Sequence, residues 1–145
     1  MSDAAAIPRS PKEELDGLPY FPRLCDKVRL QAAGTLHPDY GDNLGGGMDL
    51  WTCQFLGVDY DDLAKVIRDG ASDEEALAWA RAHGVSRPDH ERDWWLAYMH
   101  TIGFRVHLAE RLVQRKAESN LTDRDDIQTM FDYIDADDEM NRTGG

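Results

Sequence analysis

Apolar residues in this chain recur every three or four positions, and glycine or proline interrupts the pattern at short intervals. In the first clear case the apolar positions are Phe21, Leu24, Cys25, Val28 and Ala32, a spacing that places them on one face of a helix. No segment alternates apolar and polar residues as a half-buried strand does. The pattern predicts an all-α fold of about five to seven helices.

The glycines mark where the predicted helices end. Gly34, Gly70 and Gly84 each follow a periodic segment, where glycine commonly terminates a helix. Ser72 and Glu75 have the spacing of a capping box at a helix start. We expect helices over residues 21–33, 48–56, 60–69, 72–83, 89–118 and 127–134, with a glycine-rich loop over 34–47.

The longest periodic segment carries apolar residues at spacings of 4, 3, 4, 3 and 4, namely Trp95, Met99, Ile102, Val106, Ala109 and Val113. Such a seam is typical of a helix-packing face. We expect it to join copies of the chain in a homo-oligomer. Gly103 lies inside the seam, and the sequence leaves open whether the helix continues through it or turns there.

The length of 145 residues suits a single compact domain. Residues 1–16 contain two prolines and small or charged residues, and are expected to form an extended or disordered lead. Residues 17–136 form the predicted helical domain. Residues 122–142 hold eight acidic and two basic residues, a net charge of −6, and we expect a flexible acidic tail over 137–145.

The net charge of −12 argues against a nucleic-acid partner, because such binding draws on a basic surface. No apolar run approaches the ~20 residues of a membrane span, so no membrane partner is expected. The two cysteines form no framework or CxxC motif, and the start lacks the apolar core of a signal peptide. These features favour a cytoplasmic protein.

The best candidate for a ligand site is the first helix. Arg23 and Lys27 are four positions apart, and Asp26 lies three positions from both Arg23 and Arg29, so the four side chains are expected to form one solvent-facing cluster. This cluster has two interpretations: an intrahelical ion-pair network, or a patch that attracts a small anionic ligand. In the second, Tyr40 and Trp51 would form apolar or stacking walls.

The segment "DNLGGGMDLW" leads three glycines into a predicted helix, where backbone N–H groups could face an anion. It lacks the Lys-Ser/Thr of a P-loop, and a plain connector is the alternative. His37 lies near Asp39 and Asp42 in the same loop. These residues form a candidate metal site, but their spacing matches no recognised metal-ligand pattern. No recognised cofactor motif is present, so no cofactor and no metal are assigned.

The opening stretch "SPKEELDGLPYFPRLCDKVRLQAAGTL" resembles a bacterial family named domain of unknown function 5069. The resemblance covers about residues 10–100. It rests on Ser10, Pro11, Pro22, Arg23, Asp26, Lys27, Arg29, Ala33, Gly34, Tyr40, Leu56, Gly57, Asp59, Leu63, Gly70, Ser72, Asp73, Glu75, Leu77 and Trp79. It implies a cytoplasmic bacterial protein and supplies no activity, cofactor or catalytic residue, and the chain is expected to depart from the family beyond Trp95.

Three functions remain open. The first is a non-catalytic binding or regulatory protein that self-associates or binds a protein partner. The second is an enzyme of unrecognised type that binds a small anion at Arg23, Lys27 and Arg29, with Asp26 or Asp49 as general base. The third is a metal-binding protein that uses His37 and the loop acids.

Overall fold

The computed structural model describes residues 6–102 and 109–143. Within these ranges the chain is all-α, with seven α-helices, one 3-10 helix and a two-stranded hairpin, so the predicted fold class is confirmed. The hairpin pairs β1 (Glu14–Leu15) with β2 (Leu18–Pro19). The helices are α1 (Phe21–Ala32), η1 (Pro38–Asn43), α2 (Met48–Leu56), α3 (Tyr60–Arg68), α4 (Asp73–His83), α5 (Asp89–Thr101), α6 (Ala109–Glu118) and α7 (Met130–Thr143).

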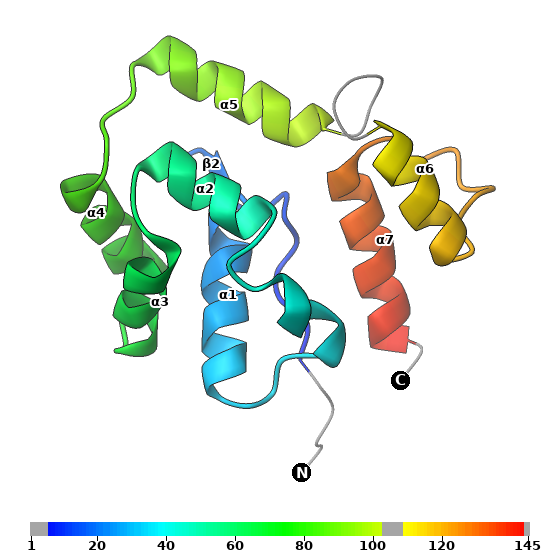
Figure 1. Cartoon of the computed structure of the whole chain (residues 1–145), viewed down its shortest axis with the longest axis horizontal. Coiled ribbons are helices and arrows are strands. Elements are labelled where there is room, and N and C mark those ends of the chain that lie inside the picture. The colour runs from blue at the N-terminus through cyan, green and yellow to red at the C-terminus, as the bar shows by residue number, and fades with distance from the viewer. Residues whose placement is uncertain (1–5, 103–108, 144–145) are drawn as a thin grey trace.

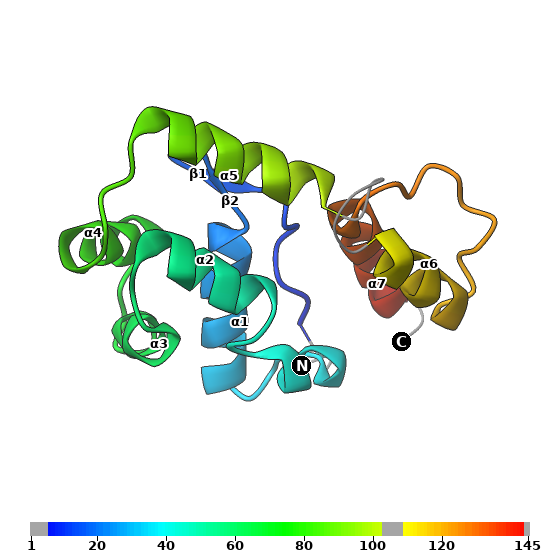
Figure 2. The same ribbon diagram turned by 45° about the horizontal axis from the view of Figure 1, so that its top comes forward.

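Helix α1 lies at the centre of the molecule, with α3 and α4 on one side and the α6–α7 pair on the other (Figure 1). Helix α5 runs across one end and links the two sides, as the turned view also shows (Figure 2). Phe21 and Leu24 of α1 are completely buried. Phe131 of α7 is buried as well, and its ring stacks on Tyr20 with centroids 6.5 Å apart. Helix α7 therefore completes the core around α1.

Local capping explains where several helices begin. Ser72 accepts from the backbone N–H of Glu75, and Glu75 accepts from that of Ser72, so the predicted capping box is present. The last helix starts later than expected, at Met130. There the Thr129 hydroxyl accepts from the backbone of Asp132, whose carboxylate accepts from the backbone of Thr129, which satisfies donors that a helix start leaves open.

The sequence left open whether residues 89–118 form one helix or two, and in the structure α5 ends at Thr101. Ile102 leaves the helical conformation, and its carbonyl accepts from the backbone N–H of Met130 at 2.7 Å. Gly103 and Val106 lie outside the described residues. Met99 and Ile102 are fully buried in the core of this chain, so the predicted oligomer seam is not a continuous exposed face.

Parts of the expected lead and of the expected tail pack against the helical domain in the described structure. In the lead, Pro8 is buried and Ala6 forms a β-bridge with Leu36. In the expected tail, residues 137–143 form the last turns of α7, and Asp138 is buried. The spacing of apolar residues did not predict this part of α7, because the buried side chain in it, Asp138, is charged.

None of the helices within residues 6–102 and 109–143 combines the length and the apolar composition of a membrane-spanning segment.

Candidate functional site

Arg23 and Lys27 form two buried ion pairs instead of a solvent-facing cluster. Arg23 is 3% exposed, and its guanidinium contacts Asp138 through both terminal nitrogens, at 2.7 and 3.3 Å. Lys27 is 4% exposed, and its amine lies 3.0 Å from the carboxylate of Asp49. Each cation is matched by one carboxylate, as buried charges generally are.

Tyrosine hydroxyls complete both pairs. Tyr20 donates to the Asp49 carboxylate at 2.7 Å, and Tyr40 donates to Asp138 at 2.5 Å. Burial raises the pKa of Tyr20 well above its usual range, and the adjacent Asp49 charge acts in the same direction. Burial lowers the pKa of Lys27, although Asp49 partly offsets this. The pairs are therefore dense hydrogen-bonded networks in a region of low polarity.

Asp26 and Arg29 belong to a separate, partly exposed network. Asp26 contacts Arg9 at 2.8 Å, and Arg29 contacts Asp73 at 2.7 Å. Arg9 also reaches Asp73, at 2.6 Å. The single cluster predicted from the sequence is thus wrong, because α1 is buried on two sides. Its polar residues divide between a face toward α2 and α7 and a face toward α4.

The buried pairs border a cavity of about 440 Å³ between α1, α2, α6 and α7, here called the interhelical cavity. Arg23, Lys27, Tyr40 and Trp51, all proposed from the sequence as ligand contacts, line it together. Asp49 is held behind Lys27 and is itself fully buried. Gly46 and Gly47 of the glycine-rich loop also line the cavity, so this loop borders the same space as Arg23 and Lys27.

The candidate metal site at His37 has less support in the structure than the interhelical cavity. His37 Nδ1 accepts from the backbone N–H of Asp39 at 3.2 Å and lies 3.9 Å from its carboxylate. The side chain of Asp42 lies outside the described part of the structure. Across the described residues, no group of three or more His, Cys, Asp or Glu side chains is arranged to hold a metal ion.

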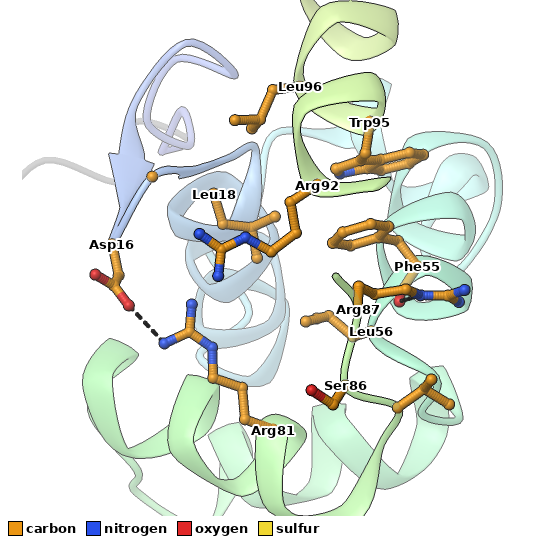
Figure 3. Close-up of a pocket in the computed structure, with 12 residues that line it drawn as sticks. Asp16, Leu18, Phe55, Leu56, Arg81, Ser86, Arg87, Arg92, Trp95 and Leu96 are labelled. Atoms are coloured by element: carbon orange, nitrogen blue, oxygen red, sulfur yellow. Dashed lines mark hydrogen bonds and ion pairs between the residues drawn. The ribbon is translucent and has the colours of Figure 1, made fainter. Parts of the chain in front are cut away.

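A second cavity, of about 360 Å³, was not anticipated from the sequence. It lies between the hairpin turn, the end of α2, the loop after α4 and the first turns of α5 (Figure 3). Three arginines and one aspartate line it, a formal charge of +2, and we call it the arginine cavity. Its lining residues are Asp16, Gly17, Leu18, Phe55, Leu56, Arg81, Val85, Ser86, Arg87, Arg92, Trp95 and Leu96.

The loop after α4 is held against the end of α2 by close backbone contact. The Val85 N–H donates to the Leu56 carbonyl at 2.9 Å. A Cβ on Gly84 would lie 2.0 Å from that same carbonyl, and one on Gly57 would lie 2.5 Å from the Val85 side chain. Both glycines are therefore required by space, and they allow Leu56 and Val85, which both line the arginine cavity, to lie against each other.

Arg87 has a structural part in this cavity. Its guanidinium donates to the carbonyls of Phe55 and Gln54, at 2.9 and 3.2 Å. These are carbonyls at the end of α2, which a basic side chain stabilises. Figure 3 shows this guanidinium under the Phe55 ring and directed away from Arg81 and Arg92. Arg87 therefore caps α2 and shapes the aromatic wall.

Arg81 and Arg92 extend into the same space from opposite sides, beside Asp16 (Figure 3). Arg81 contacts the Asp16 carboxylate at 2.6 Å. The pKa of Asp16 is lowered, mainly by its hydrogen bond with Arg81 and also by the charge of Arg92. The backbone N–H of Arg92 donates to the Pro88 carbonyl, but its guanidinium makes no hydrogen bond or ion pair with a described residue. One carboxylate thus faces two guanidinium groups.

The opposite side of the arginine cavity is aromatic. The rings of Phe55 and Trp95 stack nearly parallel, with centroids 5.0 Å apart and an interplanar angle of 6°. The Trp95 indole N–H is buried and has no hydrogen-bond acceptor among the described residues. Figure 3 shows the nitrogen edge of this indole on the side of Arg92. The cavity therefore combines two cations, a spare donor and an apolar wall.

The sequence contained a weak signal for this site. Arg81, Arg87 and Arg92 lie within twelve positions of one another and precede the Trp94–Trp95 pair. The intervening acids conceal the basic character in any count of net charge. Only the approach of the hairpin turn, more than sixty positions away from Arg81, brings Leu18 and Asp16 to complete the cavity.

The fold defines a small all-α protein that contains the arginine cavity and the interhelical cavity. Residues 5–140 match the family described as domain of unknown function DUF5069, and the chain belongs to that family. The match extends into α7, so the expected departure beyond Trp95 is wrong. No curated protein and no solved structure matches the chain.

Proposed function

We propose that this protein is a non-catalytic binding module whose arginine cavity takes a small organic anion. The observation that carries the proposal is that the Arg81 and Arg92 guanidinium groups enter one space beside an aromatic wall (Figure 3). In a chain of net charge −12, a local formal charge of +2 attracts an anion to this position.

The chemistry of the lining supports an anion with an apolar body. Guanidinium groups bind carboxylate or phosphate oxygens through paired N–H donors. Phe55, Trp95 and Leu18 offer apolar surface next to those donors, and the Trp95 indole adds one donor that lacks an acceptor. The volume of about 360 Å³ lies at the small end of ligand pockets. Together these features favour an arylcarboxylate or a similar small acid.

The ion pair and the lowered pKa of Asp16, the one carboxylate among the described residues that line the arginine cavity, favour binding over catalysis. Asp16 is engaged by Arg81, and its pKa is lowered, whereas a general base works best with a pKa near the working pH. Self-association stays a prediction, and sedimentation equilibrium measures it directly.

The test uses benzoate as the probe and the fluorescence of the protein's tryptophans as the signal, with calorimetry as a second measurement. We expect benzoate to bind and neutral benzamide, of similar shape, to bind at least tenfold more weakly. Arg92→Met should weaken benzoate binding by a similar factor while leaving the helical circular dichroism unchanged. Arg68→Met, which changes an exposed arginine of α3 outside both cavities, is the matched control.

Two results would overturn the proposal. One is benzoate binding no tighter than benzamide binding. The other is an equal effect of the Arg92 and Arg68 substitutions, because only Arg92 lines the arginine cavity.

A further inference from the structure

The amine of Lys27 stands apart from the other lysines of the chain. The sequence contains four lysines, at positions 12, 27, 65 and 116. The side chains of Lys12 and Lys65 are 49% and 70% exposed and form surface ion pairs, and Lys116 donates to two loop carbonyls. Lys27 is the buried one, and it lines the interhelical cavity.

The surroundings of this amine can exchange protons with it. Lys27 Nζ lies 3.0 Å from Asp49 Oδ1 and 3.4 Å from the Tyr20 hydroxyl, and Tyr20 contacts the same carboxylate oxygen at 2.7 Å. The other Asp49 oxygen accepts from the backbone N–H of Gly45. These two contacts use two of the three ammonium protons, which leaves one to meet a molecule in the cavity.

A buried ion pair by itself adds little stability compared with apolar packing. A buried lysine can instead have a chemical role, because a desolvated amine becomes a nucleophile near neutral pH. Burial lowers the pKa of Lys27. Asp49 can accept the ammonium proton across 3.0 Å, which leaves a neutral amine facing a cavity of about 440 Å³.

We propose that Lys27 is a nucleophilic amine that condenses with a small 2-oxo acid in the interhelical cavity. The carbonyl carbon would bond to Nζ as the carbonyl π bond breaks, and a proton passes from the nitrogen to the new alkoxide oxygen to give a carbinolamine. Asp49 then gives the hydroxyl group the proton that it took from the ammonium, the hydroxyl group leaves as water, and the nitrogen lone pair forms the C=N bond of a protonated imine beside the Asp49 carboxylate. No electrons are transferred, and one water molecule is released for each imine formed.

The preference for an acid comes from α6. Arg111 and Arg115 line the same cavity as Lys27 and supply cations for a carboxylate. Asp39 and Asp137 also line it. These carboxylates oppose a ligand with several negative charges, such as a phosphate ester, and leave a monoanion as the favoured class.

The experiment is reductive trapping with pyruvate and sodium cyanoborohydride near neutral pH. We expect one pyruvate adduct per chain in the intact mass and peptide mapping that places it on Lys27. Acetone, which has the carbonyl but no carboxylate, should label at least tenfold more slowly. Lys27→Arg, which keeps the positive charge, should lose the adduct, and Lys12→Arg should keep it.

The mapping is done on the unchanged protein, so the result does not depend on whether the Lys27 variant folds. Absence of an adduct, or labelling shared equally with Lys12, Lys65 and Lys116, would overturn the inference. The two cavities share no lining residue. Saturation with benzoate should therefore leave the trapping rate unchanged, and the outcome is independent of the arginine cavity.

Discussion

The guanidinium of Arg23 lies 2.7 Å from the carboxylate of Asp138, a residue 115 positions later in the chain. Burial acts to lower the pKa of Arg23, but the hydrogen bond and charge of Asp138 outweigh it, and the pKa is raised. This contact joins α1 to α7 at the point where the last helix covers the core.

Removal of Arg23 should be strongly destabilising. Arg23→Met would leave Asp138 buried without its cation, and we expect a loss of about 3–5 kcal/mol in the free energy of unfolding, measured by urea denaturation. Arg29→Met removes a partly exposed partner of Asp73 and should cost about 0–1 kcal/mol. Equal losses for the two variants would show that the Arg23 pair has no special role.

The capping box of α4 offers a test of local structure. Ser72→Ala removes the hydroxyl that accepts from the Glu75 backbone at 3.1 Å. We expect a decrease of about 1 kcal/mol in the free energy of unfolding. Ser86→Ala is the control, because Ser86 is exposed and lies outside any helix, and it should change stability by less than about 0.5 kcal/mol. A larger effect at Ser86 would contradict this assignment.

Helix caps and helix ends were predictable because they depend on neighbours in sequence. Ser72 with Glu75 and glycine at position 84 could be recognised from spacing alone. The burial of Arg23 and Lys27 could not, since it requires knowing that α7 and α2 cover the same side of α1. Periodicity predicts which residues share one face of a helix, but it does not predict how many faces of that helix other helices cover.

The candidate sites also divide into residues that the sequence predicted and residues that it did not. Arg23, Lys27, Tyr40 and Trp51 were proposed together from the sequence, and the structure places all four around the interhelical cavity. Arg81 and Arg92 were missed, because the cavity they line forms only when α4, α5 and the hairpin meet. Contacts between distant segments carry no local signal in a single sequence.

Alkaline pH should destabilise the fold. Burial raises the pKa of every tyrosine above the ordinary value of 10.0: Tyr20, Tyr40, Tyr60, Tyr98 and Tyr133. Above that pH the unfolded chain loses tyrosine protons that the folded chain keeps, so the free energy of unfolding falls as pH rises. The lowered pKa of Lys27 acts in the opposite direction, but the tyrosines outnumber it.

Spectrophotometric titration of tyrosinate, with circular dichroism recorded on the same samples, measures this effect. We expect tyrosine ionisation to be delayed until the helical signal is lost. Free ionisation of all five tyrosines near pH 10 in a still-folded protein would contradict the prediction.

The two thiols should be inert in the native protein. Cys25 and Cys53 are buried, and burial raises the pKa of Cys53 to about 12 and that of Cys25 further. Because the thiolate is the reactive form, a thiol reagent should modify both groups only after urea is added. Rapid modification of either thiol in the native state would show that its surroundings open readily.

The hairpin turn should weaken anion binding. Asp16 occupies Arg81 at the arginine cavity, where it competes with a ligand carboxylate. Asp16→Asn keeps the shape of the side chain and removes its charge, and we expect benzoate affinity to rise about two- to fivefold at low salt. Asp69→Asn, an exposed carboxylate of the α3 end, is the control and should leave the affinity unchanged.

The separation of Arg23 and Asp138 in sequence also orders events during synthesis. At about 5–20 residues per second, roughly 6–23 seconds pass between the incorporation of the arginine and that of its aspartate. For that interval the inner face of α1 carries a cation with no partner and an uncovered aromatic surface. The buried ion pair and the stacking of Phe131 on Tyr20 can form only after α7 has been made, so this part of the core closes late in synthesis.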